Sequence, residues 1–287
     1  MRFTTFLRGN EPRLGVLSEG CVIDLNAAEP TVPAQLRAAL DAAIDLHAAA
    51  RRAIDSRAPR LALEELTFAP LVPEPGKTIC LGLNYYDHAK EGGRERPEYP
   101  WFFLRSKSSL LGHEQPALCP KVSAQLDYEA ELAVVIGRRV PRHVEPAAAL
   151  PYVFGYTCFN DISVRDYQKR TPQWTIGKNF DATGAFGPTL VTADELEPGA
   201  VGLRIQSRLN GQVMQDANTS EMIFGVAETI TLLSQCLTLE PGDVIVMGTP
   251  AGVGFARKPP VWMKAGDTVE VEIERIGALR NPIARED

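Results

Sequence analysis

The chain of 287 residues has few cysteines, and none of them form a CxxC pair. Its five cysteines are scattered widely along the sequence, at Cys21, Cys80, Cys119, Cys158 and Cys236. Closely spaced cysteines are typical of structural zinc sites, and dense sets are typical of disulfide-stabilised secreted proteins. We therefore expect reduced cysteines and a cytoplasmic protein.

Long apolar runs and an excess of positive charge are also missing. No segment is long and apolar enough to cross a bilayer, and the N-terminus MRFTTFLRGNEPRLGV lacks the apolar core of a signal peptide. Thirty basic residues against 36 acidic ones give a net charge of -6, whereas nucleic-acid binding depends on clustered positive charge. We expect neither a membrane nor a nucleic acid as a partner.

The composition is that of a globular enzyme, with 45% apolar and 23% charged residues. The length exceeds that of a typical single domain, so a large and a small domain are expected. The proline-rich stretch at residues 69–76 is typical of a connector. We predict a small α+β domain over residues 1–70 and a larger domain over residues 71–287.

Several local patterns predict secondary structure. Ser18-Glu19-Gly20 separates two apolar segments, which predicts a hairpin. Pro33 opens a predicted helix whose apolar residues recur at helical spacing as far as Ile54. Asn210-Gly211 is a strong signal for a second hairpin.

The region after residue 76 contains many short predicted strands and few helices. The predicted strands cover residues 78–83, 129–137, 154–160, 203–209, 212–215, 244–247 and 268–276, and one helix face is formed by Ile223, Val226, Ile230 and Leu233. This pattern favours an α+β, mainly β, architecture with mixed sheets over a doubly wound fold.

The most informative segment is DYEAELAVVIG, at residues 127–137. Alternate side chains of a strand share a face, so Glu129 and Glu131 point the same way, roughly 6.6 Å apart, with Asp127 beside them. Crowded like charges on a half-buried surface repel each other and resist desolvation. A hard divalent cation removes both costs because it prefers carboxylate oxygens. A solvent-facing strand edge with incidental acids is the alternative.

Two further acids, Asp161 and Asp166, follow the strand predicted at residues 154–160. Strand ends are common positions for metal ligands, because the scaffold fixes them while the loop stays open. Asp161 would add a third carboxylate to the glutamate pair. The alternative is a surface ion pair between Arg165 and one of these two aspartates.

Only four histidines are present, so candidates for a general base are few. His88 and Glu91 are three residues apart, and one helical turn would bring them together. A carboxylate that holds one imidazole nitrogen leaves the other free to act as a base, the usual arrangement for activating water. Gly92 and Gly93 would allow the loop to hinge. A purely structural histidine is the alternative.

Lys178 lies among apolar residues in WTIGKNFD, where a cation could bind a carboxylate or stabilise an enolate oxygen. Pro172 occupies the position of the first P-loop glycine, which excludes that motif. The glycine-rich segment at residues 248–254 resembles the start of a dinucleotide fingerprint, but Arg257 replaces the third glycine and no long helix follows. We predict instead a loop of backbone N–H groups for a small anion.

Six segments in this order resemble the fumarylacetoacetate hydrolase family, in its acylpyruvase or fumarylpyruvate hydrolase branch. They are NYYDHAKE, DYEAELAVVIG, GYTCFNDISVRDYQ, WTIGKNFD, LNGQVMQDANTSEMIF and GDVIVMGTPAGVG, and the resemblance covers about residues 75–280. It implies the family's mixed β-roll, which agrees with the strands expected above. It also implies a metal-dependent catalytic domain over residues 71–287 and a homodimer.

The resemblance also implies roles for the matching residues. Mg²⁺ or Mn²⁺, with Ca²⁺ as a structural substitute, would be the cofactor, and its ligands would be Glu129, Glu131 and Asp161. The catalytic residues would be His88, Glu91 and Lys178, and the substrate contacts would be Arg105, Gln168, Lys178 and Thr249.

One segment departs from the family pattern. Where many members read Phe-Leu-Lys-Pro, this chain reads Phe103-Leu104-Arg105-Ser106. Arginine keeps the charge but offers a planar fork suited to a carboxylate.

These residues would act on a small-molecule 2-oxo acid. We expect hydrolysis of a C–C bond in a 2,4-dioxo acid, an acylpyruvate such as fumarylpyruvate, as in aromatic catabolism. His88 would take a proton from water, and Lys178 with the metal would hold the pyruvate enolate that leaves. Closure of the loop at Gly92 and Gly93 would exclude bulk water.

Other reactions fit the same residues. They are decarboxylation of oxaloacetate, dehydration or hydrolysis of a 2-keto-3-deoxy sugar acid, and lysis of ureidoglycolate. A metal-dependent oxo-acid binding protein without turnover is the alternative outside enzymes. The presence of His88, Glu91 and Lys178 argues against it.

Overall fold

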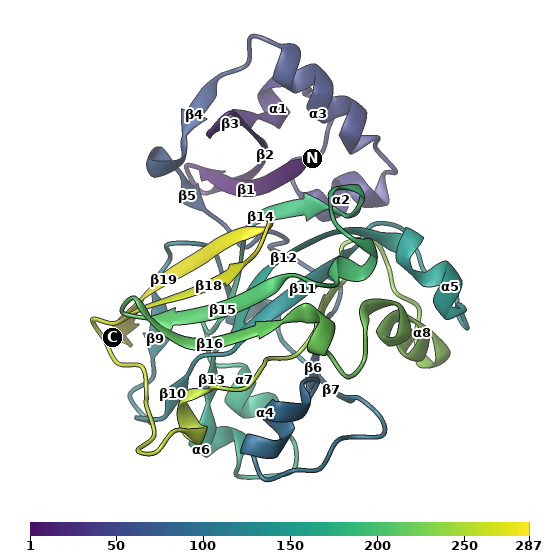
Figure 1. Ribbon diagram of the computed structural model, residues 1–287. Helices are drawn as coiled ribbons and strands as arrows, with labels where there is room; N and C mark the ends of the chain where they lie inside the picture. Colours follow the sequence, from purple (N-terminus) through teal and green to yellow (C-terminus); the bar gives the residue numbers. More distant parts are fainter. Residues whose placement is uncertain (287) are drawn as a thin grey trace.

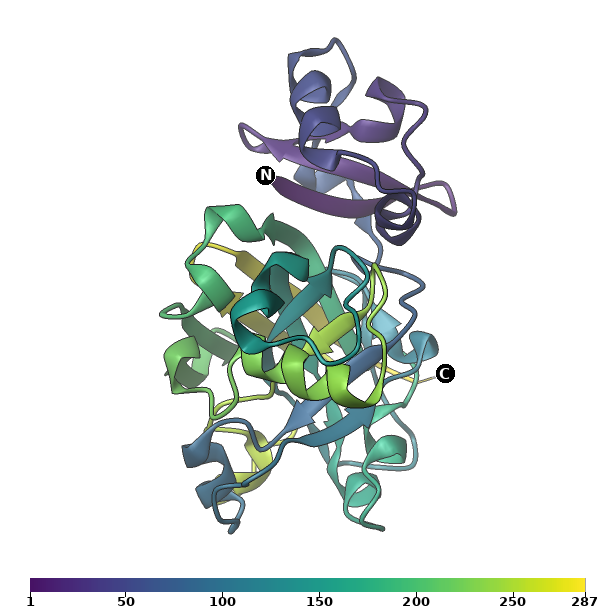
Figure 2. The ribbon, with the colours of Figure 1, turned by 90° about the vertical axis from the view of Figure 1, so that its right-hand side faces the viewer.

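The computed structural model describes residues 1–286, and its largest feature is a mixed sheet (Figures 1 and 2). Its main path runs β4-β3-β2-β1-β14-β12-β11-β17-β6-β7, with β5 paired to β1 and β8 to β14. In chain order these strands are β1 (Arg2–Arg8), β2 (Glu11–Ser18), β3 (Cys21–Asp24), β4 (Arg60–Ala62), β5 (Thr67–Phe68), β6 (Thr78–Gly82), β7 (Trp101–Leu104), β8 (Leu110–Leu111), β11 (Ala130–Ile136), β12 (Val153–Asp161), β14 (Gly184–Thr192) and β17 (Val244–Val246).

A second sheet has the order β16-β15-β18-β19-β9 and lies against one face of the first. Strands β10 and β13 pair with each other and form a third, two-stranded sheet. These strands are β9 (Ala117–Cys119), β10 (Leu126–Asp127), β13 (Ser163–Val164), β15 (Arg204–Leu209), β16 (Gln212–Asn218), β18 (Thr268–Ile273) and β19 (Gly277–Arg285). The α+β, mainly β, fold predicted from the sequence is confirmed.

The helices are short and surround the sheets. They are α1 (Leu25–Ala28), α2 (Leu36–Asp41), α3 (Leu46–Asp55), α4 (Tyr86–Glu91), α5 (Pro146–Ala149), α6 (Arg165–Gln168), α7 (Thr175–Lys178) and α8 (Val226–Cys236). The 3₁₀ turns are η1 (Leu63–Glu65), η2 (Lys107–Ser109), η3 (Leu150–Tyr152), η4 (Ala193–Glu195), η5 (Pro198–Ala200), η6 (Thr219–Glu221) and η7 (Gly254–Ala256). Within residues 1–286, no helix is long and apolar enough to cross a membrane.

Strand β11 is buried on both faces, which explains its apolar sequence. Leu132, Val134 and Ile136 enter the core shared with the five-stranded sheet and α8. Ala133 and Val135 face the core that α2 and α3 complete on the other side of the large sheet. Side chains therefore alternate between two cores along one strand.

The two predicted hairpins are confirmed. Strands β2 and β3 pair antiparallel around Glu19 and Gly20, and β15 and β16 pair around Asn210 and Gly211. All four turn residues have positive φ, from 51° to 80°. Left-handed backbone at both central positions gives the turn twist that matches paired strands.

The helix predicted from Pro33 to Ile54 is wrong as a single element. The chain forms α2 and α3 with a break at Ala43, which has a φ of 51°. The Asp45 side chain then accepts a hydrogen bond from Ala48 N at 2.9 Å and caps α3. The capping aspartate starts a new helix although the apolar spacing continues.

The N-terminal region forms a unit of β1–β5 and α1–α3, seen at the top of Figure 1. Its strand β1 pairs with β14, with Arg2 opposite Val191 and Phe3 opposite Leu190. The unit ends with β5, close to the proline-rich connector. The division into domains at residues 1–70 and 71–287 stays a prediction. Within the described residues, 1–286, strands from both parts belong to one continuous sheet.

The topology brings distant acidic residues together. Strands β11 and β12 are antiparallel, with Ala130 opposite Asn160, so the start of β11 and the end of β12 meet at one edge. Helices α4, α6 and α7 gather at this end, away from the N-terminal unit (Figure 1). The residues near positions 88, 130, 161 and 178 therefore lie around a single site at this end of the molecule.

Candidate functional site

Three buried carboxylates form the centre of the site. One oxygen from each of Glu129, Glu131 and Asp161 lies within 4.8 Å of the others. None of the three residues is more than 4% exposed. The i, i+2 spacing on the strand and the antiparallel register with β12 produce this arrangement, so the structure brings together the three carboxylates predicted from the sequence.

Three buried cations surround these acids. Lys178 Nζ lies 2.5 Å from both Glu129 Oε2 and Asp161 Oδ2. Arg165 pairs with Glu129 Oε1 at 2.7 Å, and Arg105 pairs with Asp161. The nearby aspartate and glutamate raise the pKa of Lys178 although burial acts to lower it, so its ammonium stays charged.

The pKa values of the two glutamates move in opposite directions. Burial raises the pKa of Glu131 well above its ordinary value, and the carboxylates of Asp161 and Glu129 raise it further. Burial also acts to raise the pKa of Glu129, but Arg165 and Lys178 outweigh it and hold that pKa below its ordinary value. Within residues 1–286, Glu131 makes no ion pair and accepts one hydrogen bond, from Gly248 N at 2.6 Å.

The glycine-rich loop at residues 248–254 was predicted to bind a small anion, but its backbone N–H groups donate to carboxylates of the protein instead. Gly248 N donates to Glu131, Gly252 N donates to Glu91 Oε2 at 2.9 Å, and Gly254 N donates to Asp127 Oδ1 at 2.7 Å. The loop therefore fixes carboxylates of the site in place. Asp127 lies beside the triad and pairs with Arg165.

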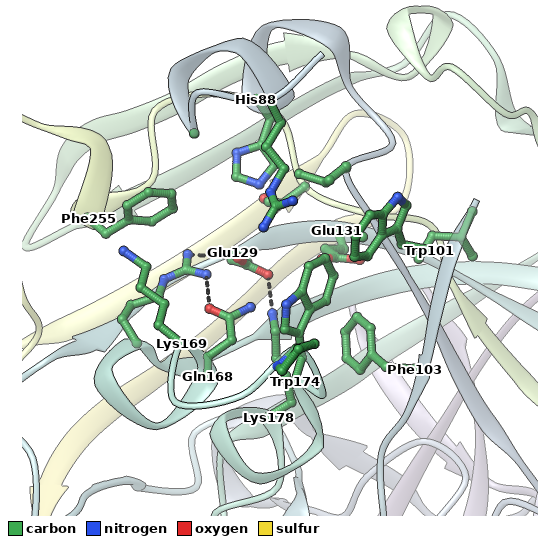
Figure 3. Close-up of a pocket in the computed structure, with 18 of the residues that line it drawn as sticks. His88, Trp101, Phe103, Glu129, Glu131, Gln168, Lys169, Trp174, Lys178 and Phe255 are labelled. Atoms are coloured by element: carbon green, nitrogen blue, oxygen red, sulfur yellow. Dashed lines mark hydrogen bonds and ion pairs between the residues drawn. The ribbon is translucent and has the colours of Figure 1, made fainter. Parts of the chain in front are cut away.

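His88 and Glu91 form the predicted pair on one turn of α4. His88 Nδ1 lies 2.8 Å from Glu91 Oε1, and the other carboxylate oxygen of Glu91 is held by Gly252 N. His88 is 7% exposed, and its ring lines the cavity above the acids (Figure 3). Within the described chain, Nε2 of His88 has no protein partner, which leaves it free to exchange a proton.

These groups line a cavity of about 480 Å³ (Figure 3). Gln168 and Thr249 reach it, as expected of substrate contacts. Its other lining residues include aromatic rings and charged side chains, among them Trp101, Phe103, Trp174, Phe255, Arg94 and Lys169. A mostly apolar pocket with a few converging polar groups is typical of a small-molecule site.

Arg105 differs from the prediction of a substrate contact. Its side chain is fully buried behind Asp161, where it also donates to Ile162 O at 2.6 Å and to Thr183 Oγ1 at 3.3 Å. It does not line the cavity. Its fork holds a carboxylate of the protein, although Trp101 and Phe103 of the preceding strand β7 line the cavity.

Arg165 was considered in the sequence only as a surface partner of Asp161 or Asp166. It is buried and binds Asp127 Oδ2 at 2.7 Å as well as Glu129. Pairing of β10 with β13 sets Asp127 opposite Ser163, two residues before Arg165, and no local pattern in the sequence reveals this long-range register.

Gln215 is another site residue that the sequence reading missed. It is 1% exposed, and its Nε2 donates to Thr249 Oγ1 at 2.7 Å, while its Oε1 accepts from Ala130 N at 3.0 Å. Gln215 thus fixes the start of β11 and the wall of the cavity. The signals for it were its position after the Asn210-Gly211 hairpin and its place in the segment LNGQVMQDANTSEMIF.

The donor set fits a hard divalent cation. Carboxylate oxygens are the ligands that Mg²⁺ and Mn²⁺ prefer. The centre contains four buried carboxylates and three buried cations, so one formal negative charge is left over when all of them are ionised. The carboxylates are Asp127, Glu129, Glu131 and Asp161, and the cations are Arg105, Arg165 and Lys178. Glu129, Glu131 and Asp161 would hold the ion.

Comparisons with known proteins agree with this site. The family model described as fumarylacetoacetate (FAA) hydrolase C-terminal matches residues 77–284. The chain is 42% identical to oxaloacetate tautomerase FAHD2A, mitochondrial, of Bos taurus over 95% of this chain and 87% of that protein.

Two solved structures are similar over the whole of both chains. Fumarylacetoacetate hydrolase from Exiguobacterium antarcticum has a TM-score of 0.85 and 34% identity. Maleylpyruvate hydrolase from Sphingobium sp. SYK-6, in complex with manganese (II) ion and pyruvate, has a TM-score of 0.83 and 28% identity.

Proposed function

The chain belongs to the fumarylacetoacetate hydrolase family, and from that premise we propose that this enzyme interconverts the keto and enol forms of a 2-oxo dicarboxylic acid such as oxaloacetate. One observation carries the proposal: His88, held by Glu91 and free at Nε2, faces the same cavity as the acidic triad and Lys178. A 1,3-proton shift requires a base that takes the proton from carbon and a positive charge that stabilises the oxygen as it becomes negative. The bovine relative, named an oxaloacetate tautomerase, supports this choice.

His88 moves the proton at carbon 3. In the keto-to-enol direction, Nε2 takes that proton, the C–H electron pair forms the double bond between carbons 2 and 3, and the carbonyl pair moves onto the oxygen. The oxygen then takes a proton from water, and the hydroxide that remains takes the proton of the imidazolium, which restores neutral His88. In the reverse direction water protonates Nε2, the hydroxide that remains takes the proton of the enol oxygen, and the imidazolium gives its proton to carbon 3. Glu91 stabilises the imidazolium from the Nδ1 side, 2.8 Å away.

Lys178 supplies positive charge where the oxygen of carbon 2 becomes negative. Its ammonium is 2% exposed, so water screens it little. When bound by Glu129, Glu131 and Asp161, a divalent cation supplies Lewis-acid polarisation of the 2-oxo group. Arg105 holds Asp161 in place from outside the cavity, and Arg165, which lines the cavity, holds Glu129.

Hydrolysis of an acylpyruvate is the second candidate. The cavity of about 480 Å³ has room for an acid longer than oxaloacetate, and the manganese and pyruvate complex of maleylpyruvate hydrolase supports a pyruvate-releasing reaction. His88 would then take a proton from water as its oxygen bonds to carbon 4. The bond between carbons 3 and 4 would break, and its electron pair would stay on the pyruvate fragment.

A paired assay separates the two reactions. Enol-form oxaloacetate and an acylpyruvate are each mixed with the enzyme and Mn²⁺, and enol absorbance and pyruvate are both followed. The proposal expects fast loss of the oxaloacetate enol without pyruvate release. Rapid pyruvate release from the acylpyruvate, with no effect on the oxaloacetate enol, would favour hydrolysis and overturn the first proposal.

A further inference from the structure

The charged side chains of the cavity fall into two groups. Arg165 and Lys178 are tied to carboxylates of the site. Two other cations, Arg94 and Lys169, line the cavity but make no ion pair within residues 1–286. Each lies instead against an aromatic ring. Unpaired cations that line a binding cavity and remain exposed are groups available to an anionic substrate.

Lys169 lies beside the proposed base. Its Nζ is 4.3 Å from the centroid of the Phe255 ring, and the His88 ring meets the same phenyl edge-on at 6.5 Å. Arg165 packs on that ring as well, with Cζ at 4.6 Å. Figure 3 shows Lys169 and Phe255 together on one side of the cavity, with Trp101 on the other.

The electrostatic surroundings of Lys169 favour an added anion. Partial burial and the neighbouring Arg165 lower the pKa of Lys169, while Asp127 acts in the opposite direction. The lowered pKa means that the protein's own negative groups do not offset the cost of keeping this ammonium charged. A carboxylate placed next to the ammonium would supply it.

The order of atoms in the substrate points to the same residue. A 2-oxo acid that places its first two carbons at the triad presents carbon 3 to His88 Nε2. In oxaloacetate, carbon 4 is the carbon of the second carboxylate and lies one bond beyond carbon 3. His88 and Lys169 contact the same Phe255 ring, so Lys169 is an unpaired cation next to the group that handles carbon 3. Arg94 stands instead over Trp101, with Cζ 5.3 Å from the ring centroid.

We propose that Lys169 binds the second carboxylate of the substrate, and that it makes the enzyme selective for 2-oxo dicarboxylic acids over 2-oxo monocarboxylic acids. This inference rests on the proposed function. It assigns to Lys169 the carboxylate contact that the sequence suggested for Arg105, which is buried behind Asp161.

The kinetic test compares oxaloacetate with phenylpyruvate, a 2-oxo monocarboxylic acid that enolises at the same carbon. Lys169→Met should lower kcat/KM for oxaloacetate about tenfold or more, mainly through KM, because a charge-assisted contact is lost. The loss for phenylpyruvate should be at least fivefold smaller, roughly the difference that one such contact makes. Lys169→Arg should recover most of the oxaloacetate activity.

The neighbouring residue provides a matched control. Arg170 is also an exposed cation stacked on an aromatic ring, that of Tyr167, but it does not line the cavity. Arg170→Met should leave the ratio of the two kcat/KM values unchanged. Equal losses for both substrates in Lys169→Met would contradict the inference, and a selective loss in Arg94→Met alone would move the carboxylate to Arg94.

A binding measurement keeps this test independent of turnover. Malate and lactate differ in the second carboxylate, and calorimetry with Mn²⁺ present measures the affinity of each. Wild-type protein should prefer malate about tenfold or more, and Lys169→Met should remove that preference. Wild-type protein that binds malate selectively without enolising oxaloacetate would overturn the proposed function alone. A malate preference that survives in Lys169→Met would overturn the role of Lys169.

Discussion

Glu131 is a residue where burial and the neighbouring carboxylates both oppose ionisation. Its carboxyl group is 1% exposed, lies near Asp161 and Glu129, and accepts one backbone hydrogen bond. Glu129, two residues earlier, has instead two cationic partners. A cation shared by the three carboxylates would relieve the repulsion on Glu131.

Glu131→Gln should therefore weaken Mn²⁺ binding about tenfold or more, because it removes one of three anionic ligands without changing shape. Isothermal calorimetry on protein stripped of metal measures the affinity. Glu270→Gln, on the five-stranded sheet, serves as the control and should bind Mn²⁺ like the wild type. Unchanged affinity in Glu131→Gln would rule out the triad as the metal site.

His88→Ala should lower kcat by about 10² to 10⁴, the usual effect of removing a general acid or base. The Mn²⁺ affinity should stay within about twofold of wild type, because the imidazole is assigned to the substrate and not to the ion. His143→Asn, at an exposed position of positive φ, is a control that should change neither quantity. A loss of metal by His88→Ala would contradict this division of roles.

At the residue scale, local spacing was enough to predict the Glu129–Glu131 pair and the His88–Glu91 pair, whereas the assignment of Asp161 as the third ligand depended on the family resemblance. The i, i+2 and i, i+3 patterns fix which side chains meet. The environment of Arg105 could not be predicted in this way, because it depends on where β7 ends relative to β12. Arg165 was misjudged for the same reason, since its partners come from a strand pairing across 38 residues of sequence.

At the scale of elements, the loop at residues 248–254 joins the metal centre to the base. Its N–H groups reach Glu131, Glu91 and Asp127 in turn. The glycine spacing predicted an anion-binding loop but could not identify the anions, which come from β10, β11 and α4. The break between α2 and α3 escaped prediction because a capping aspartate outweighed continuing apolar spacing.

Gly254→Ala should disturb this loop sterically. A Cβ there would clash with the carbonyl oxygen of Val261 and lie 2.6 Å from Asp127 Oδ1. We expect a loss of about 1 to 3 kcal/mol in the free energy of unfolding, measured in urea, and reduced activity. A Cβ at Gly225 would meet nothing within 4 Å, so Gly225→Ala should cost less than about 1 kcal/mol. Equal stability of the two variants would contradict this account of the loop.

At the scale of the whole molecule, the N-terminal unit is joined to the rest by the β1–β14 pairing and by His113. The imidazole of His113 meets Phe68 edge-on at 5.2 Å, and its Nδ1 accepts a hydrogen bond from Arg280 N at 3.0 Å. Burial, helped by Arg280, lowers the pKa of His113 to about 4, although Glu114 lies 3.6 Å from Nε2. The homodimer expected from the family resemblance stays a prediction.

This pKa shift makes part of the stability depend on pH. Below the ordinary pKa of about 6.5, the unfolded chain binds a proton at His113 that the folded chain does not, so the free energy of unfolding falls as the pH drops from about 6.5 toward 4. The contribution is on the order of 1 to 3 kcal/mol. Urea unfolding of wild type and His113→Gln at several pH values should show a gap that shrinks or reverses in acid. A constant gap between pH 4 and 7 would disprove this role for His113.

Proton exchange at carbon 3 of oxaloacetate tests the central claim most directly. In D₂O with Mn²⁺, the wild-type enzyme should speed incorporation of deuterium at carbon 3, followed by NMR, while the four-carbon acid stays intact. His88→Ala should lose this acceleration by about 10² or more. Exchange no faster than with Mn²⁺ alone, or pyruvate appearing in place of deuterated oxaloacetate, would contradict the proposed proton shift.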